Sequence, residues 1–552
     1  MVRVYCKNTG TSKDVQEGLT LLEILPQFEF EKPYPIIAAK VNNVSQGLKY
    51  RVYNNQDVEF VDYRTYVGRG VYRRSLCFLL CKAATDLFPG CRITLRRPIA
   101  KGYLCDIVKK DGTKSTRKDI DAIKARMQEL VDADVEFHRH EARLDDVVEV
   151  FSKMGYQDKV KLLQTSEDVY VKYYTLEGTP DYFYDALLPS TGYLKVWELT
   201  PFRGSFILRV PNRHHPEKLA PFYIQDKTYD IFLENIRWNK IMNLENVGDV
   251  NLACRRGEAS NLIQVSEALQ EKKIVQIAET IHSRFCDKEN PVKVVLITGP
   301  SSSGKSTFCR RLSIQLMACG VQPVFFSTDD YFVNRVDTPK LPDGSYDFDN
   351  FETVDHKALE KDVVKLLSGK EVEVPEYNFV TGKREYNGRK FRMDGSKILL
   401  IEGIHALNPE LIPQIPDQNK FKIFISVLTS ISLDDHNCIP TSDNRLLRRI
   451  VRDYNKGAFS PQETIRQWPN VRRSEVQWVY PYQENADVLF NSAYLIEFAV
   501  MRSHAEQILR MVPRNSPEYN EAHRLLKFLS YFNRVSDKEL PVTSMIRSFI
   551  FP

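Results

Sequence analysis

Several features that would assign a protein to a special class are missing from this sequence of 552 residues. No apolar run approaches the roughly 18 residues that a membrane helix needs, so we expect no membrane partner. Residues 1–10 have no apolar core and no cleavage-like site, which argues against a secretory signal. The 24 glycines and 28 prolines are too few for a collagen-like or low-complexity chain. We therefore expect a globular, cytoplasmic protein.

Cysteine pairs and a strong charge of one sign are also lacking. None of the ten cysteines forms a CxxC pair. Cys77 and Cys81, followed by Cys91 and Cys105, leave a metal site open, but buried free thiols in a reducing compartment are the favoured interpretation. The net charge of +5 is low for a dedicated nucleic-acid binder and still permits anionic partners.

The length predicts three or four domains, at roughly 150 residues each. We expect a small β-rich unit at residues 1–62, an α+β unit at 63–225, a helical connector at 226–290 and an α/β unit at 291–552. Continuous apolar runs in the last unit are typical of parallel strands buried on both faces. They are Val292–Thr298, Val324–Thr328, Ile398–Ile401 and Phe421–Val427. Helical stretches between them predict a doubly wound parallel sheet.

One motif in the last unit carries clear chemistry. Gly299-Pro300-Ser301-Ser302-Ser303-Gly304-Lys305-Ser306, followed by Thr307, fits G-x-x-x-x-G-K-[ST] between a strand and a helix. Glycines let backbone N–H groups surround phosphates, and the helix N-terminus adds partial positive charge. Lys305 would reach the β- and γ-phosphates, and Ser306 would bind Mg²⁺. The segment predicts an ATP-binding P-loop.

Acidic residues follow the next two strands. Asp329 comes directly after one strand and Glu402 ends another. Ligands in such sheets lie at the carboxyl ends of strands. Asp329 is therefore a candidate base for an acceptor hydroxyl, and Glu402 a candidate Mg²⁺ contact, direct or through water. The alternative for Asp329 is a helix cap or a turn, and the alternative for Glu402 is a solvated acid at a strand end.

Arginines recur on one face of a later helix. Their spacing is i, i+3, i+4 and i+7, at Arg445, Arg448, Arg449 and Arg452. Neighbouring guanidinium groups repel one another unless anions neutralise their charge. One interpretation is therefore that these arginines form a lid over the transferring phosphate. A solvated face paired with Asp443 and Asp453 is the other.

Together these residues resemble the uridine kinase/phosphoribulokinase family of P-loop kinases, from about Val292 to Ser492. The P-loop is followed, in the order of that family, by four short motifs and an arginine helix. These are Asp329-Asp330-Tyr331-Phe332, Tyr346-Asp347-Phe348-Asp349, Pro375-Glu376-Tyr377-Asn378-Phe379, Ile401-Glu402-Gly403-Ile404 and Arg445-Leu446-Leu447-Arg448-Arg449-Ile450-Val451-Arg452-Asp453.

The resemblance implies a role for each matching residue. Asp329 would be the base on a nucleoside 5′-hydroxyl, and Glu402 would contact Mg²⁺ through water. Lys305, Arg445 and Arg448 would act on the transferring phosphate. The substrate would be bound by Tyr331, Asp349, Tyr377, Phe379, Arg448 and Gln467, with Asp349 on the ribose and the two aromatic side chains of Tyr377 and Phe379 against the base.

Two positions depart from the family pattern. Gly382 stands where uridine/cytidine kinases place a histidine that reads the base, and Phe332 replaces a tyrosine. The preferred base is therefore open, whereas phosphoryl transfer to a hydroxyl is little affected.

The front half resembles other modules. Residues 1–62 resemble a TGS domain, a small β-grasp module, and 63–225 resemble the second domain of threonyl-tRNA synthetase. The second resemblance rests on Arg74–Leu80, Pro98–Tyr103 and Pro189–Gly192. The whole order resembles a bacterial architecture labelled nucleoside kinase.

That synthetase domain hydrolyses mischarged tRNA with a His/His/Cys/His cluster. The corresponding positions here are Arg74, Phe78, Phe183 and Leu187, and none is a usable metal ligand or base. We therefore expect no editing activity, although the front half remains a candidate RNA-binding region.

The leading hypothesis is an ATP- and Mg²⁺-dependent kinase of a nucleoside 5′-hydroxyl. One alternative is a kinase of another small hydroxyl acceptor, such as a sugar phosphate. A second is an RNA-binding, translation-associated protein switched by its nucleotide. The sequence specifies no phosphate donor preference, oligomeric state or role for the front modules.

Overall fold

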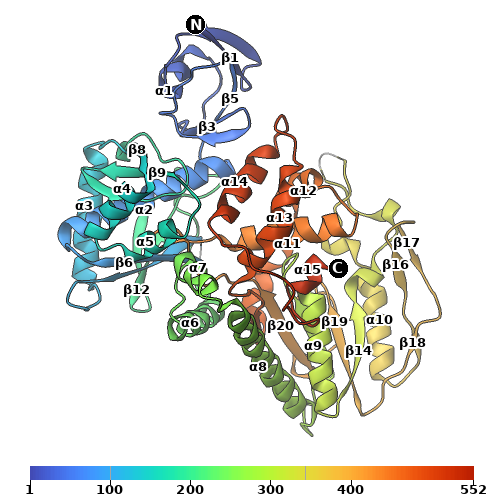
Figure 1. Ribbon diagram of the computed structural model, residues 1–552. Helices are drawn as coiled ribbons and strands as arrows, with labels where there is room; N and C mark the ends of the chain where they lie inside the picture. The colour runs from blue at the N-terminus through green and yellow to red at the C-terminus, as the bar shows by residue number, and fades with distance from the viewer. Residues whose placement is uncertain (100, 342–343) are drawn as a thin grey trace.

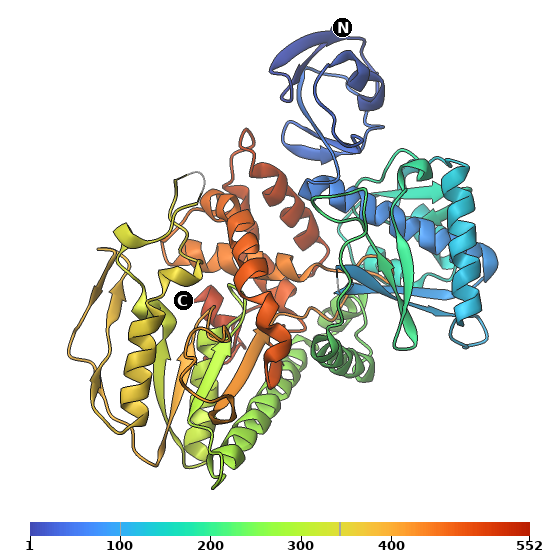
Figure 2. The same cartoon turned by 180° about the vertical axis from the view of Figure 1, so that it is seen from behind.

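The computed structural model describes residues 1–99, 101–341 and 344–552. A small N-terminal unit lies at one end of the molecule and contacts both other units, and the second unit packs beside a larger α/β unit (Figure 1). The view from behind shows the same arrangement (Figure 2). Among the described residues, no helix is both long and apolar enough to cross a membrane.

The small unit is a mixed five-stranded sheet, in the order β2-β1-β5-β3-β4, with one short helix. Its strand β1 alternates buried and exposed residues, as a sheet with one covered face requires. Leu21 and Ile24 of the helix are fully buried against that face. The elements are β1 Val2–Cys6, β2 Thr11–Val15, α1 Leu21–Ile24, β3 Ala38–Val41, β4 Val44–Gln46 and β5 Gln56–Val61.

The second unit packs helices against two antiparallel sheets, ordered β10-β9-β8 and β11-β12-β7-β6. Its central helix begins at Tyr66, where the Thr65 side chain accepts a hydrogen bond from the Gly68 N–H and caps the helix. Ala100, in an expected turn, lies outside the described residues. The elements are α2 Tyr66–Leu87, β6 Arg92–Ile99, β7 Gly102–Val108, α3 Arg117–Asp132, β8 His138–Arg143, α4 Leu144–Lys153, α5 Gln157–Gln164, β9 Tyr170–Leu176, β10 Thr179–Asp181, β11 Glu198–Phe202 and β12 Ser205–Arg209.

A helical connector follows, made of α6 Asp226–Ile241, α7 Val247–Arg255 and α8 Ala259–Phe285. Helix α8 packs against α9 Lys305–Ala318 beside the last sheet (Figure 1). Buried isoleucines of α8 join the sheet core there.

The α/β unit is built on five parallel strands in the order β14-β19-β13-β20-β21. Four of these strands match the apolar runs of the sequence, while the short edge strand β21 was not anticipated. The strands are β13 Val294–Thr298, β14 Gln322–Ser327, β19 Lys397–Glu402, β20 Lys420–Ser426 and β21 Val488–Asn491. A doubly wound parallel sheet is thus confirmed.

Further helices and two small hairpins complete this unit. They are α10 His356–Leu367, α11 Thr441–Asn455, α12 Pro461–Trp478, α13 Glu497–Arg510, α14 Tyr519–Ser530 and α15 Arg547–Ile550, with β15 Val372–Glu373, β16 Glu376–Asn378, β17 Lys383–Glu385 and β18 Lys390–Phe391. Helix α14 lies where the α/β unit meets the second unit (Figure 1).

One hydrophobic core crosses the expected domain boundaries. It contains Phe151 of α4, Val250 of α7, Leu446 of α11 and Phe528 of α14, all buried. The second unit, the connector and the α/β unit therefore bury apolar surface against one another as well as within themselves.

Candidate functional site

The P-loop follows β13 and turns into α9, as the sequence predicted. Gly304 caps the helix with φ +90°, and a Cβ on Gly299 would come within 2.3 Å of the Ile425 carbonyl oxygen. Glycine is required at both places for these reasons. Lys305 Nζ donates to the Gly299 carbonyl at 3.0 Å. The hydroxyls of Ser302 and Ser303 are buried without a hydrogen-bond partner among the described residues.

Two of the four helix arginines brace this loop from α11. Arg445 Nη1 donates to the Ser301 carbonyl at 3.0 Å, and its guanidinium pairs with Glu475. Glu475 in turn accepts a hydrogen bond from the Ser301 N–H at 3.0 Å. Burial opposes the charged carboxylate, but Arg445 and Arg472 outweigh it and lower the pKa of Glu475.

Arg448 has an equivalent partner in Glu497, which accepts from Nη2 at 2.7 Å. It also donates to the Ser302 carbonyl at 3.3 Å. Arg445 and Arg448 are only 1% and 0% exposed. They differ from the expected lid, because buried carboxylates and loop carbonyls already occupy their donors. Sequence spacing showed the shared helix face but could not show Glu475 and Glu497, which are far along the chain.

The other two arginines pair with Asp453, as the alternative interpretation proposed. Arg449 Nε and Arg452 Nη2 lie 3.3 and 2.7 Å from its carboxylate oxygens. Arg449 also donates to the Ser301 hydroxyl at 2.9 Å. Asp443, the other acid considered, pairs with Arg524 instead.

Asp329 and Glu402 lie at the carboxyl ends of β14 and β19, close enough to influence each other. Burial raises the pKa of Glu402 to about 7, with Asp329 and Asp330 adding to it, while Lys305 and Ser306 oppose the rise. Burial likewise raises the pKa of Asp329, with Lys305 acting in the opposite direction. The structure brings Lys305, Ser306, Asp329 and Glu402 together as one site.

This site fits a nucleotide with its divalent cation. Unpaired loop hydroxyls can donate to phosphate oxygens, and Lys305 can add a positive charge there. The crowded carboxyl groups at Asp329 and Glu402 resist ionisation, which a nearby cation would relieve.

His405 is a site neighbour that sequence reasoning missed. It is 1% exposed, and neither ring nitrogen has a hydrogen-bond partner within the described parts of the chain. Burial lowers the pKa of His405 to about 4, so the ring is neutral. The backbone of Asp349 lies next to the His405 ring. Burial raises the pKa of the Asp349 carboxyl group to about 6. The only sequence signal was its place just after the strand that ends in Glu402.

An aromatic cluster lies around the hairpin of β16 and β17. Tyr377 and Phe379 are 5.0 Å apart between ring centroids, and Phe332 lies 5.5 Å from Tyr377. Phe379 is 59% exposed and free to stack with a ligand. Tyr377 is 4% exposed, so a ligand would meet mainly Phe379.

Two expected substrate contacts lie elsewhere. Tyr331 is fully buried in the core and its hydroxyl donates to Asp362 at 3.2 Å. The expected contact of Tyr331 with the substrate is corrected for this reason, because its ring packs in the core beside Phe326. Gln467 is half-buried on α12, and no described contact joins it to the P-loop or to Asp329.

The departure at Gly382 has a structural reason. The residue has φ +69°, and a Cβ there would lie 2.8 Å from Arg335 Cβ. The Arg335 guanidinium donates to the Phe379 carbonyl, and its N–H donates to the Gly382 carbonyl at 2.8 Å. Arg335 therefore packs closely against Gly382 and leaves no room for a side chain at that position. No described carboxylate pairs with Arg335.

The four positions of the synthetase cluster are structural here. Phe78, Phe183 and Leu187 are buried in the core of the second unit, with the two rings 5.4 Å apart. Arg74 lies 3.2 Å from Asp185. Cys77, Cys81, Cys91 and Cys105 are buried free thiols, as favoured.

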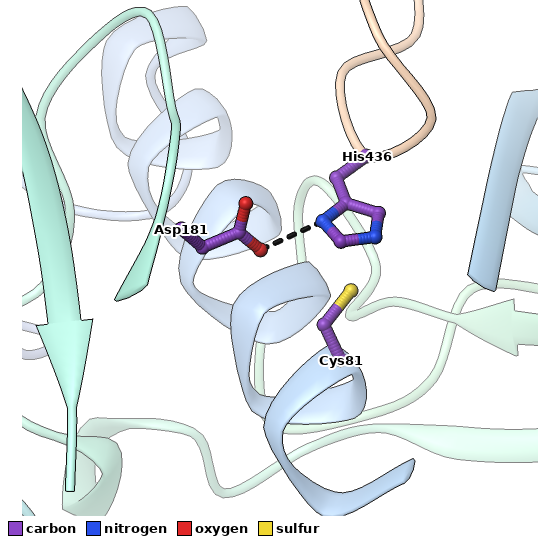
Figure 3. Close-up of side chains that lie close together, drawn as sticks. All are labelled: Cys81, Asp181 and His436. Atoms are coloured by element: carbon purple, nitrogen blue, oxygen red, sulfur yellow. Dashed lines mark hydrogen bonds and ion pairs between the residues drawn. The ribbon is translucent and has the colours of Figure 1, made fainter. Parts of the chain in front are cut away.

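A different cluster joins the two large units. Cys81, Asp181 and His436 lie close together, and His436 Nδ1 is 2.7 Å from the Asp181 carboxylate (Figure 3). Lys159 Nζ lies 3.1 Å from both Asp181 and Asp434. His436 and Asp434 come from the α/β unit, more than 250 residues along the chain from Asp181, so no sequence pattern indicated this contact.

The charges of this cluster balance without a metal ion. Burial opposes an imidazolium, but Asp181 outweighs burial and raises the pKa of His436. Lys159 and His436 therefore face the carboxylates of Asp181 and Asp434. Burial raises the pKa of the Cys81 thiol, which keeps it protonated and a poor metal ligand. The cluster serves as an ion network between the units.

Comparisons with known proteins agree with the division of the chain. The N-terminal region is similar to threonine–tRNA ligases: 26% identical over 198 residues to that of Methylobacillus flagellatus, and 27% over 199 residues to that of Maricaulis maris. Each match covers 36% of this chain and 31% of the relative. The chain thus spans about a third of the length of these curated relatives.

Solved structures overlap with about two fifths of the chain. "A Possible Uridine Kinase from Bacillus stearothermophilus" covers 40% of this chain and 98% of its own at 20% identity, with a TM-score of 0.27. D-glycerate 3-kinase from Cryptococcus neoformans var. grubii covers 47% of this chain and 87% of its own at 14% identity, with a TM-score of 0.21. Scores this low support no inference about this chain.

The family comparison falls on the site itself. The model of the Phosphoribulokinase / Uridine kinase family matches residues 294–496. This range begins with β13, includes the P-loop, Asp329 and Glu402, and ends just before α13. Residues 294–496 are therefore similar to the Phosphoribulokinase / Uridine kinase family and contain the P-loop, and they follow a front region similar to threonine–tRNA ligases.

Proposed function

We propose that the protein transfers the γ-phosphate of ATP to the 5′-hydroxyl of a nucleoside. The observation that carries this proposal is the placement of Asp329 beside Lys305 and Glu402 at the carboxyl edge of the sheet. A base that can take a hydroxyl proton thus lies next to the side chain that meets the transferring phosphate.

The chemistry balances with these groups. The acceptor oxygen attacks the γ-phosphorus, an O–P bond forms, and the bond between that phosphorus and the β–γ bridging oxygen breaks to release ADP. The acceptor proton passes to the Asp329 carboxylate. Lys305 and the backbone N–H groups of the P-loop stabilise the charge that spreads over the phosphoryl oxygens.

Mg²⁺ would be held by the Ser306 hydroxyl and Glu402, and would neutralise phosphate charge. Arg445 and Arg448 serve in this proposal as positioning residues, because they hold the loop carbonyls of Ser301 and Ser302. Their buried carboxylate partners keep them in place in the absence of nucleotide.

Stacking supports a nucleoside acceptor. Phe379 is exposed beside Tyr377 and Phe332, and an aromatic surface suits a flat base. Asp349 would accept hydrogen bonds from ribose hydroxyls, consistent with its place next to His405.

A second acceptor class is favoured by Arg335. Its guanidinium lies among these acceptor-side residues and has no described carboxylate partner. A cation in this place suits a phosphorylated acceptor, such as a sugar phosphate, better than a neutral base edge. The two classes differ in charge, so one assay separates them.

The test is a phosphate-transfer assay on the full-length chain with Mg-ATP. The acceptors are uridine, cytidine, adenosine, guanosine, inosine, ribose and ribose 5-phosphate. A monophosphate formed from one nucleoside, and lost in Lys305→Ala, supports the nucleoside kinase. Product from ribose 5-phosphate alone, lost in Arg335→Met, supports the anionic acceptor.

The role of Asp329 has its own control. Asp329→Asn keeps the shape of the side chain and removes the base, so it retains ATP binding and loses about 10²–10⁴ in turnover. Near-normal turnover in this variant would refute the assigned base. Bound ATP without transfer to any acceptor would favour a nucleotide-switched, RNA-binding protein instead.

A further inference from the structure

A cavity of about 720 Å³ lies between the second unit and the α/β unit, away from the P-loop residues. One wall is the face of α2 that carries Tyr66, Arg69 and Arg73. The opposite wall includes Arg472 of α12 and Arg524 of α14. Its size is in the range of small-molecule sites, about 300–1,000 Å³.

The walls of this interdomain cavity carry far more positive than negative charge. Its carboxylates are Asp185 and Glu484, whereas the cations are Arg69, Arg73, Arg74, Lys101, Arg472 and Arg524. Asp185 is already paired with Arg74, and Glu484 accepts from Thr228. Arg472 pairs with Glu475, and Arg524 pairs with Asp443 and Glu521. The lining cations without a described carboxylate partner are therefore Arg69, Arg73 and Lys101.

Arg69 and Arg73 show this excess most clearly. They are four residues apart on α2, where side chains share a face. Arg73 Nε is buried with no hydrogen-bond partner among the described residues, and no described carboxylate forms an ion pair with either arginine. Burial, reinforced by the charges of Arg213 and Arg73, lowers the pKa of Arg69 to about 10. An anion between these guanidinium groups would relieve the repulsion.

Tyrosines supply the rest of the lining. Tyr66, Tyr103, Tyr184, Tyr223 and Tyr480 all border the cavity. Aromatic faces beside guanidinium groups suit a flat ring that carries a charged substituent. Four of these rings already lie beside a cation: Tyr66 beside Arg524, Tyr184 beside Arg74, Tyr223 beside Lys101 and Tyr480 beside Arg472.

We propose that this interdomain cavity binds a nucleoside phosphate, as a second nucleotide site separate from the P-loop. The phosphate would lie against Arg69 and Arg73, and the base would stack on the tyrosines. No bond is made or broken in this step.

A short path joins the interdomain cavity to the P-loop. Arg472 Nη1 donates to Glu475 at 2.8 Å and to the Tyr480 hydroxyl at 3.0 Å. Glu475 also accepts hydrogen bonds from the Ser301 N–H and from Arg445, as described above. A ligand that engages Arg472 would therefore act on the same carboxylate that braces the P-loop, which makes this site suited to an effector.

Photolabelling of the full-length chain tests this proposal. The probes are azido-AMP and azido-UMP, used with the P-loop saturated by Mg²⁺ and a non-hydrolysable ATP analogue. Mapped peptides should carry the label at cavity tyrosines such as Tyr66 and Tyr480. Arg69→Gln/Arg73→Gln should weaken this labelling by about tenfold or more and leave P-loop binding unchanged. Lys305→Ala should leave the cavity label intact.

Arg237→Gln, at an exposed position on α6, is the matched control and should change nothing. The double variant should unfold at a temperature close to that of the wild type, because the loss of two like charges offsets the loss of the hydrogen bond from Arg69 to the Arg64 carbonyl oxygen. Equal cavity labelling in the wild type and the double variant overturns the proposal. The proposal is also overturned if inorganic phosphate displaces the label as well as AMP does. Binding of an RNA oligonucleotide but of no mononucleotide in the cavity would overturn it too.

Discussion

Replacing Lys159 with methionine should show how strongly the second unit and the α/β unit are joined. The Lys159 side chain is fully buried, and Nζ lies 3.1 Å from one oxygen each of Asp181 and Asp434. Lys159→Met keeps most of the side-chain volume and removes the charge. His436 alone would then face two buried carboxylates.

The expected cost follows from this burial. Breaking a buried ion pair by removing one partner costs about 3–5 kcal/mol, because the other partner stays buried and uncompensated. Lys161 offers a matched control on the same helix, α5. Its Nζ lies 2.8 Å from Asp249, but its side chain is 42% exposed. Solvent screens such a pair, so Lys161→Met should cost only about 0–1 kcal/mol.

Urea denaturation of the two variants and the wild type measures this difference through the midpoint. Limited proteolysis gives a second readout, since a weakened junction should expose the segment between α5 and α7. The reasoning is refuted if Lys159→Met shifts the midpoint no further than Lys161→Met does.

The other predictions concern pH, the acceptor side and the P-loop brace. Asp181 outweighs burial and raises the pKa of His436, so the ion pair stabilises the fold fully below the unfolded pKa of about 6.5, and this stability is lost as pH rises through the folded pKa. Urea midpoints measured from pH 6 to 9 should therefore fall less in His436→Gln than in the wild type. Parallel pH profiles of the two proteins would contradict this prediction. Gly382→His should cost about 1–3 kcal/mol, because its φ is +69°, without creating pyrimidine preference in the transfer assay; a stable, pyrimidine-selective variant would disprove it. Glu475→Gln should cost about 3–5 kcal/mol and weaken ATP binding measured by calorimetry, because Arg445 stays buried without its counterion; unchanged affinity and stability would count against the brace.

Local features of the site were predictable from sequence, because they depend on short-range chemistry. The P-loop has a fixed spacing, and Asp329 and Glu402 directly follow apolar strands whose carboxyl ends must share one edge. The parallel sheet was predictable because continuous apolar runs separated by helical stretches are typical of parallel strands. The short strand β21 was missed because Val488–Asn491 gives too little pattern to distinguish it from a loop.

Features that depend on distant partners were not predictable. Helical spacing placed Arg445 and Arg448 on one face, but a solvated lid and a buried brace have the same spacing. Only the fold shows that Glu475 and Glu497 meet them. The interdomain cavity likewise combines Arg69 with Arg524, and the C-terminal helices that supply part of its wall gave no chemical signal in sequence.

The hydrophobic core that spans α4, α7, α11 and α14 limits how this protein can be divided or recombined. A cut near residue 290 would leave each piece with an apolar face that was made to be covered by the other. The two halves resemble modules that occur in different proteins, yet here neither can be exchanged without its partner surface. Evolution of this chain is therefore constrained at the junction, where substitutions in one half must suit the side chains of the other.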